Sequence, residues 1–168
     1  MSEPTLIRAD NRLLHGMVAT HWVRAWHITR IIIVDDGVYG DMFLRQIYEL
    51  AKPLETSVEF WTMDDAVSGW KEGKFEEAPG EHILLLIKNI YNAKKMFDEG
   101  MNFSKLILGP MESIKGKQCI NNVYFMDDAD AQVLDGMAGQ GVQITFQEQS
   151  VTKSTTWENI KARYFKKL

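Results

Sequence analysis

The sequence contains a single cysteine and no long uninterrupted hydrophobic stretch. One cysteine excludes an internal disulfide and a cysteine-based metal cluster, and we expect Cys119 to be a small packing residue in a reducing compartment. The first residues, Met-Ser-Glu-Pro-Thr, lack the basic and apolar regions of a secretory signal. No apolar run approaches the ~20 residues of a membrane span. We therefore expect a cytoplasmic protein without direct membrane insertion.

An excess of positive charge is also absent. The chain has 19 Lys and Arg against 23 Asp and Glu, a formal net charge of -4. A nucleic-acid-binding protein needs a net basic face, so we exclude nucleic acid as a partner. The 168 residues, 45% of them hydrophobic, are enough for one sizeable core, and no linker-like segment divides them. We predict a single domain over residues 1–168.

Short apolar runs alternate with stretches of helical periodicity along the chain. Two runs, 31–34 and 83–87, are apolar at every position, which is typical of strands buried on both faces of a parallel sheet. We expect strands at 5–9, 31–34, 58–61, 83–87, 106–108, 123–125 and 142–146. The alternation predicts an α/β fold, an open and mostly parallel sheet of about six to seven strands covered by helices on both faces.

Side-chain spacing indicates which faces of the helices are buried. In the first helix, the spacing of Val18, Trp22 and Trp26 predicts one stripe that faces the sheet. Three later helices are expected to begin at capping residues, and a further helix is expected over residues 130–138. The expected caps are Asp41, Thr62 and Asn89. Buried positions are expected in the helix after Asp41 and in the closing helix: Phe43, Ile47, Leu50, Trp157, Ile160, Tyr164 and Leu168.

The strongest chemical signal follows the first strand, where residues 8–16 read Arg-Ala-Asp-Asn-Arg-Leu-Leu-His-Gly. This polar loop delivers His15 to the start of a helix. An imidazole with a pKa near ~6.5 is partly neutral, and therefore nucleophilic, at cytoplasmic pH. Free N–H groups at a helix start, with Arg12 beside them, can hold a phosphoryl anion. A lone histidine in a loop is also often structural, so the spacing alone leaves both interpretations open.

The neighbours of this histidine suggest roles in binding a phosphoryl group. Gly16 lets the backbone come close, and Arg12 is either a planar cationic fork for phosphate oxygens or an exposed surface charge. Asp10 either orients the imidazole of His15, by accepting from its second nitrogen, or only holds the loop. Met17 keeps a backbone N–H donor next to the site but has no polar side chain.

Residues 8–18 resemble the signature of the IIB subunits of the mannose/fructose/sorbose class of the bacterial sugar phosphotransferase system, R-x-D-x-R-L-x-H-G-Q-V after the first strand. Met17 stands in place of the usual glutamine, and Asn11 in place of a commoner acidic residue. The stretches 31–36, 83–89 and 106–111 resemble later strands of that family in the same order. The resemblance therefore covers nearly the whole chain.

This resemblance implies a cytoplasmic phosphocarrier, an enzyme of the phosphohistidine–sugar phosphotransferase type. His15 would take phosphate on Nδ1 from the phosphohistidine of a IIA partner and pass it to a sugar that arrives through IIC and IID membrane subunits. Asp10, Arg12, Gly16 and Met17 would bind the phosphate or orient the loop. We expect no cofactor. The sequence does not name the sugar, and it allows a homo-oligomer.

A receiver-like domain is one alternative, because Asp35 and Asp36 end the second strand and form an acidic pair that suits Mg²⁺. That interpretation needs an acceptor aspartate after the third strand, which instead ends in tryptophan and threonine. His21 and His27 are six residues apart and do not share a helix face as paired ligands do. We therefore expect no metal site.

Two further alternatives concern the histidine itself. A histidine phosphatase or mutase has Arg, His and Gly contiguous after the first strand, whereas Leu13 and Leu14 intervene here. A non-catalytic or regulatory phosphate-sensing module would keep the fold and lose the phosphate relay. Met17 is the one local feature that favours this last interpretation.

Overall fold

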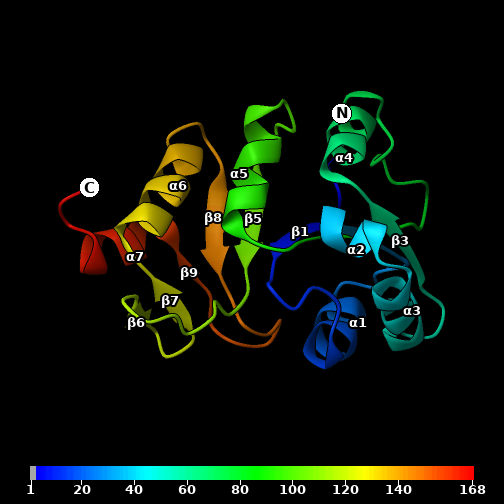
Figure 1. Cartoon of the computed structure of the whole chain (residues 1–168), viewed down its shortest axis with the longest axis horizontal. Helices are drawn as coiled ribbons and strands as arrows, with labels where there is room; N and C mark the ends of the chain where they lie inside the picture. Colours follow the sequence, from blue (N-terminus) through cyan, green and yellow to red (C-terminus); the bar gives the residue numbers. More distant parts are fainter. Residues whose placement is uncertain (1–2) are drawn as a thin grey trace.

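The computed structural model describes residues 3–168; Met1 and Ser2 of the predicted domain lie outside this range. The strands of the main sheet are β1 Leu6–Ala9, β2 Arg30–Val34, β3 Ser57–Trp61, β4 Ile83–Ile87, β5 Lys105–Leu108, β8 Gln143–Phe146 and β9 Thr155–Thr156. They are ordered β3-β2-β4-β1-β5-β8-β9. All neighbours pair in parallel except β9, which is antiparallel to β8. The predicted open, mostly parallel sheet is confirmed (Figure 1).

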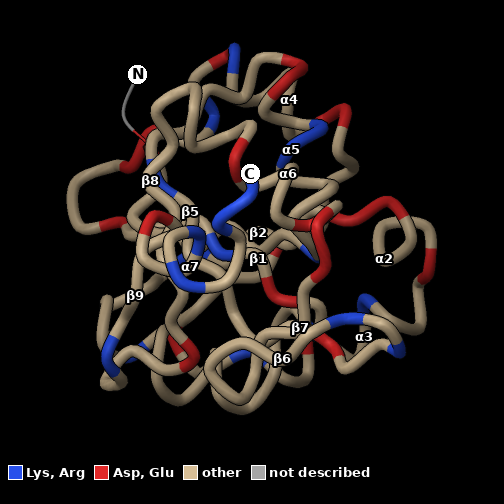
Figure 2. Tube along the Cα trace, turned by 90° about the vertical axis from the view of Figure 1, so that its left-hand side faces the viewer, with Lys and Arg blue, Asp and Glu red and all other residues tan. Residues whose placement is uncertain are grey.

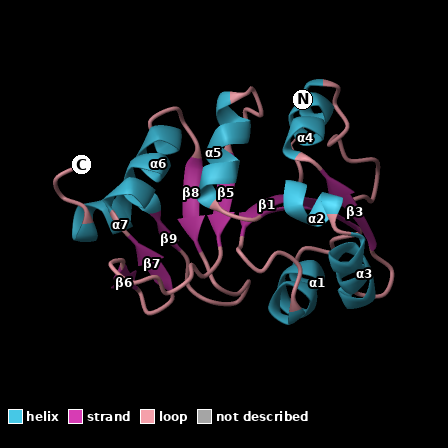
Figure 3. Cartoon of the chain, in the orientation of Figure 1, coloured by secondary structure: helices cyan, strands magenta, loops and turns pink. Residues whose placement is uncertain are grey.

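Helices cover both faces of this sheet. They are η1 Val18–Trp22 (a π-helical turn), α1 Val23–Ala25, α2 Asp36–Gly40, α3 Met42–Ala51, α4 Met63–Lys71, α5 Ile90–Asp98, α6 Asp128–Ala138 and α7 Trp157–Tyr164. In Figures 1 and 3, α1 and α3 lie on one side of the sheet, and α4, α5 and α6 lie on the other. The expected caps Asp41, Thr62 and Asn89 each accept a backbone N–H at a helix start, as predicted.

The two faces of the sheet carry two separate cores. Along β4, Leu84 and Leu86 pack with the first helix, whereas Ile83, Leu85 and Ile87 pack with α4, α5 and α6. Burial on both faces explains why this strand is apolar at every position. Charged positions lie mainly in the outer helices and loops (Figure 2). No helix within residues 3–168 is long and apolar enough to cross a lipid bilayer.

The chain changes sides at the centre of the sheet. After β1 it passes through α1 to β2, and after β4 it passes through α5, on the opposite face, to β5. Since β1 and β4 are neighbours in the sheet, the loops that follow them leave towards opposite faces. Such a switch point is where open α/β sheets bind their ligands.

The first helix differs from the expected stripe. Val18 and Trp22 are buried, but the Trp26 side chain is 46% exposed. The π-helical turn over 18–22 carries more residues per turn than an α-helix, so it shifts the positions that follow. Val23 and Ile28 are buried in place of Trp26.

The prediction that α3 buries Phe43, Ile47 and Leu50 is wrong. These side chains are 69%, 44% and 87% exposed. The helix contacts the sheet through Leu44 and Tyr48 instead, and the ring of Tyr48 lies 6.4 Å from that of Phe60 on β3. Because β3 is the edge strand, the neighbouring stripe of α3 extends past the sheet.

Three smaller expectations also change. Cys119 is exposed on β6 Gln118–Ile120, so it is not a packing residue. This strand pairs antiparallel with β7 Tyr124–Met126, a pairing that the pattern of residues did not indicate. Leu168 lies beyond the end of α7 and is exposed, although Trp157 and Ile160 are buried as expected.

Two leucine-to-alanine variants test which side chains belong to a core. We expect Leu50→Ala to change the free energy of unfolding by no more than about 0.5 kcal/mol, because the side chain is exposed. Leu85→Ala, in the fully buried centre of β4, should cost about 2–5 kcal/mol. Urea denaturation measures both. A cost for Leu50→Ala similar to that of Leu85→Ala would show that α3 faces a core.

Candidate active site

The loop between β1 and the first helix is held at both ends. At its start, the backbone N–H of Asp10 donates to the carbonyl of Ile87 (2.9 Å), which continues the pairing of β1 with β4. A turn follows, in which Leu13 has a positive φ of 55° and its N–H donates to the Asp10 carbonyl. Leu13 and Leu14 are both buried. This pair anchors the loop in the core, so that His15 emerges at a fixed point.

His15 lies immediately before the first helical turn. Its carbonyl accepts the N–H of Ala19 (2.9 Å), and residues 16 and 17 are already helical. Its side chain is 16% exposed, and Nε2 lies 3.2 Å from Oδ2 of Asp10. A carboxylate only accepts hydrogen bonds, so the nitrogen that faces it carries the hydrogen. Nδ1 then has the free lone pair, and it has no hydrogen-bond partner among residues 3–168.

Asp10 is a buried carboxylate with three donors. It accepts from the guanidinium of Arg8 (3.1 Å), from the backbone N–H of Arg12 (3.2 Å) and from His15. Burial raises the pKa of Asp10. The hydrogen bond from His15 and the charge of Arg8 lower it by more than burial raises it, so the pKa lies below its usual value. Asp10 is therefore ionised at neutral pH.

Arg8 is a site residue to which the sequence pattern alone assigned no role. It is fully buried, and its guanidinium lies 4.7 Å from the centre of the Trp22 ring. It donates to the carbonyls of Gln147 (2.8 Å) and Glu148 (3.1 Å) as well as to Asp10. Burial lowers its pKa, although an arginine stays charged in a protein. The one feature of the sequence that could have indicated this role is that Arg8 is the only charged residue in an otherwise apolar strand.

Gly109, at the end of β5, is a second site residue that was not predicted. A Cβ atom built on it would lie 2.5 Å from Oδ2 of Asp10 and 2.6 Å from Nη2 of Arg8. No side chain fits at this position without displacing the ion pair. The glycine therefore allows the backbone after β5 to pack directly on the pair.

The structure brings all five predicted site residues together around one loop. Arg12 is about half exposed, with Nε 3.7 Å from Oδ1 of Asp10. Gly16 is exposed, and a Cβ atom there would meet nothing within 4 Å, so no packing requirement inside the chain explains the glycine. Met17 is partly buried in the first helical turn.

The acidic pair after β2 caps helices. Asp35 accepts the N–H of Val38 (2.9 Å) at the start of α2, and Asp36 accepts the N–H of Met63 (2.8 Å) at the start of α4. Within residues 3–168 there is no group of three or more His, Cys, Asp or Glu side chains placed to hold a metal ion. Both aspartates thus have a structural role that accounts for their presence.

A family model described as the PTS system sorbose subfamily IIB component matches residues 4–167. The chain belongs to this family. The sorbose-specific EIIB component of Klebsiella pneumoniae is 28% identical over 140 residues, 83% of this chain and 84% of that protein. The mannose-specific EIIAB component of Escherichia coli K12 is 25% identical over 145 residues, 86% of this chain. The chain spans only 44% of the length of that relative.

Solved structures of the same kind share the fold. The IIBSor domain of the Klebsiella pneumoniae sorbose permease superposes with a TM-score of 0.84 at 25% identity, covering 98% of this chain and 99% of that one. The manxB structure from Thermoanaerobacter tengcongensis gives a TM-score of 0.83 at 25% identity, covering 95% of each chain. The family match and these structures confirm the resemblance to IIB subunits that the residues of the His15 loop indicated.

The variant Gly109→Ala tests the close packing behind Asp10. We expect a loss of about 1–3 kcal/mol in unfolding free energy, because the new methyl group overpacks the buried pair. The ¹⁵N shifts of the His15 ring should also change as Asp10 moves away from Nε2. Gly40→Ala is the control, since a Cβ atom there meets nothing within 4 Å. Unchanged His15 shifts in Gly109→Ala would contradict this role.

Proposed function

We propose that this chain is a phosphohistidine carrier of a sugar phosphotransferase system. It accepts a phosphoryl group on Nδ1 of His15 from the phosphohistidine of a IIA domain or protein and passes it to a sugar presented by IIC and IID membrane subunits. The activity is that of a protein phosphohistidine–sugar phosphotransferase located in the cytoplasm. The observation that carries the proposal is the contact between Asp10 and Nε2 of His15, which leaves Nδ1 free at a helix start.

Uptake requires a neutral imidazole with a lone pair on the correct nitrogen. The lone pair of Nδ1 attacks phosphorus, the N–P bond of the donor breaks, and the donor imidazole leaves with its electron pair. The ring of His15 gains positive character as the new bond forms. The ionised Asp10 faces Nε2–H and stabilises that charge without moving.

The phosphoryl oxygens need donors near the helix start. Within residues 3–168 no side chain caps the first helical turn, which begins at residue 16, and N–H groups in a first turn have no acceptor within their own helix. Arg12 adds a half-exposed guanidinium that is free to turn towards the phosphate. Arg8, in contrast, is fully buried, and both of its Nη atoms already donate to Asp10 and to two carbonyls, which supports a positioning role for it.

Transfer to the sugar reverses the same bond changes. A hydroxyl oxygen of the sugar attacks phosphorus, the N–P bond breaks, the electron pair returns to Nδ1 and the hydroxyl proton leaves to solvent. In-line geometry and charge stabilisation supply most of the rate in such transfers. A loop fixed by buried leucines on one side and by Asp10 on the other suits this requirement.

We expect His15→Ala to abolish phosphate uptake from a phosphorylated IIA protein. The wild-type adduct should be acid-labile and base-stable, as a phosphoramidate is, and His27→Ala should be labelled normally because its side chain is exposed on the far end of the first helix. Radiolabelled phosphate transfer measures all three proteins. Label that persists in His15→Ala, or that lies on Asp35 or Asp36, contradicts the proposal. A folded wild-type protein that takes up no label would favour the regulatory module.

Arg12→Gln should slow phosphate uptake roughly ten- to a hundredfold, since a charge-assisted bond to phosphate is worth ~1.5–3 kcal/mol and each decade corresponds to about 1.4 kcal/mol. Its thermal midpoint should barely move because the side chain is half exposed. Arg12→Lys should recover only part of the rate, since lysine loses the forked geometry. Arg24→Gln is the matched control, because Arg24 is an exposed arginine that lies in the first helix and outside the His15 loop. A destabilised Arg12→Gln with a normal transfer rate would make Arg12 a structural anchor.

A further inference from the structure

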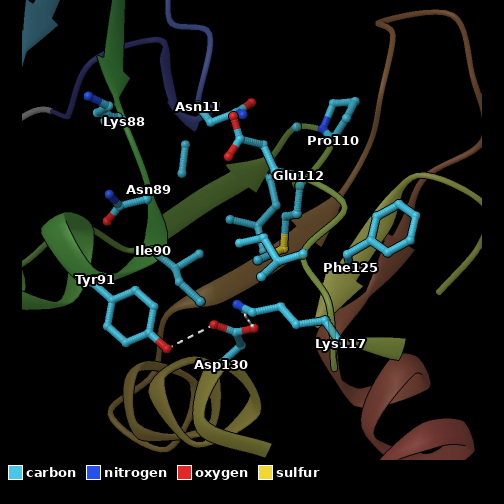
Figure 4. A pocket seen from close by; sticks show the side chains of 15 residues that line it. Asn11, Lys88, Asn89, Ile90, Tyr91, Pro110, Glu112, Lys117, Phe125 and Asp130 are labelled. Carbon is cyan, nitrogen blue, oxygen red and sulfur yellow. Dashed lines mark hydrogen bonds and ion pairs between the residues drawn. The ribbon is translucent and has the colours of Figure 1, made fainter. Parts of the chain in front are cut away.

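A hollow lies beside the His15 loop, at the carboxyl ends of β1, β4 and β5 (Figure 4). Its volume is about 270 Å³. At ~30 Å³ for each water molecule in the liquid, this space corresponds to roughly nine waters, or to one six-membered ring with its substituents. The hollow occupies the switch point of the sheet, where α/β proteins bind small ligands.

The floor of this pocket is a fixed polar cluster. Asp130 is fully buried and accepts from the Tyr91 hydroxyl (2.8 Å) and from Nζ of Lys117 (2.6 Å), as Figure 4 shows. Burial and the charge of Asp130 raise the pKa of Tyr91 to about 12, so the phenol remains a donor to Asp130. The Tyr91 oxygen can still accept a hydrogen bond, and the Lys117 ammonium has further N–H groups. The floor therefore has unused hydrogen-bonding capacity.

The walls combine amides with an apolar surface. Oδ1 of Asn89 accepts the N–H of Asn92 (2.8 Å), but its NH₂ group has no partner within residues 3–168. Asn11 also lines the pocket, and its amide makes no hydrogen bond in the same range. Phe125, on β7, lies opposite Asn89 in Figure 4, and Met111, after β5, also lines the pocket. Amides next to an apolar wall suit a ligand with hydroxyl groups at its edge and a C–H face.

The charges around the pocket balance. Its lining contains two cations, Lys88 and Lys117, and two anions, Glu112 and Asp130. A site for a phosphate ester or a carboxylate would need an excess of positive charge. We propose that this pocket binds an uncharged polyhydroxylated ring of hexose size; that this ring is the unphosphorylated transported sugar rests on the proposed function.

This pocket is distinct from the place where phosphate is transferred. Gly109 lines it and packs directly on Asp10, and Asn11 is the next residue in the chain. Asp10 faces Nε2 of His15, whereas Nδ1 lies on the other flank of the ring. His15 itself does not line the pocket, so a sugar bound there contacts Gly109 and Asn11, next to the support of His15, and not the imidazole. Binding of the sugar and phosphorylation of His15 then influence each other through Asp10.

The test is a ¹H–¹⁵N NMR titration of the unphosphorylated protein with mannose, fructose and N-acetylgalactosamine in separate experiments. For a ligand of this size we expect a dissociation constant on the order of 1–10 mM, with shifts centred on Asn11, Asn89 and Tyr91. Tyr91→Phe should weaken binding about fivefold, the effect of one hydrogen bond. Ile114→Trp, at the exposed rim, should block it, and Val151→Trp, exposed and outside the pocket, should not.

Inorganic phosphate and mannose 6-phosphate are the charged probes. Saturable shifts of the pocket residues with either probe, but with none of the neutral sugars up to about 100 mM, would overturn the neutral-ring proposal, as would sugar binding that survives Ile114→Trp. No saturable shift with any probe would also overturn it. Phosphate uptake from a IIA protein is measured on the same samples. Normal uptake without sugar binding removes only the pocket proposal, whereas sugar binding without uptake removes only the carrier function.

Discussion

The geometry of the candidate site depends on one buried carboxylate, Asp10. A buried charge is costly unless donors surround it, and here Arg8, the N–H of Arg12 and His15 all point at it. Arg8 is in turn fixed by the Trp22 ring and by two carbonyls of the loop after β8. Moving Asp10 would leave an uncompensated buried arginine, so the carboxylate stays in place and the imidazole stays oriented. Orientation of the nucleophile thus follows from the requirement to satisfy a buried ion pair.

The rest of the fold holds Asp10 and His15 in place by packing around β1, the strand that leads into their loop. β1 is a central strand between β4 and β5, with packed cores on both faces. Leu13 and Leu14 enter one of these cores directly, and the left-handed backbone of Leu13 is maintained by that packing. Close-packed interiors yield little to local forces. A loop anchored in this way keeps the His15 imidazole in one orientation, which the proposed two-step phosphate transfer would require.

The sequence predicted those parts of the structure that depend on neighbouring residues. Strand β4 was evident because burial on both faces makes it continuously apolar, and the His15 loop was evident because its residues are consecutive. The roles of Arg8 and Gly109 were not evident, since each depends on contacts with segments that lie far away in the sequence, in the case of Arg8 139 and 140 residues away. Periodicity correctly identified the apolar face of α3, but it cannot tell whether another element covers that face. The exposure of Leu50 is decided by the position of α3 over an edge strand.

Two departures from the family signature, at residues 11 and 17, lie outside the hydrogen-bond network that supports His15. Met17 lies in the first helical turn, where the backbone N–H is the group that would face a phosphate in the proposed function. Asn11 lines the neighbouring pocket, where an acidic residue would add an uncompensated negative charge. Arg8, Asp10 and Gly109, in contrast, can hardly vary without breaking the buried pair. Changes at residues 11 and 17 therefore alter the surface that a bound group would contact, while the Arg8–Asp10 pair that orients the imidazole is left intact.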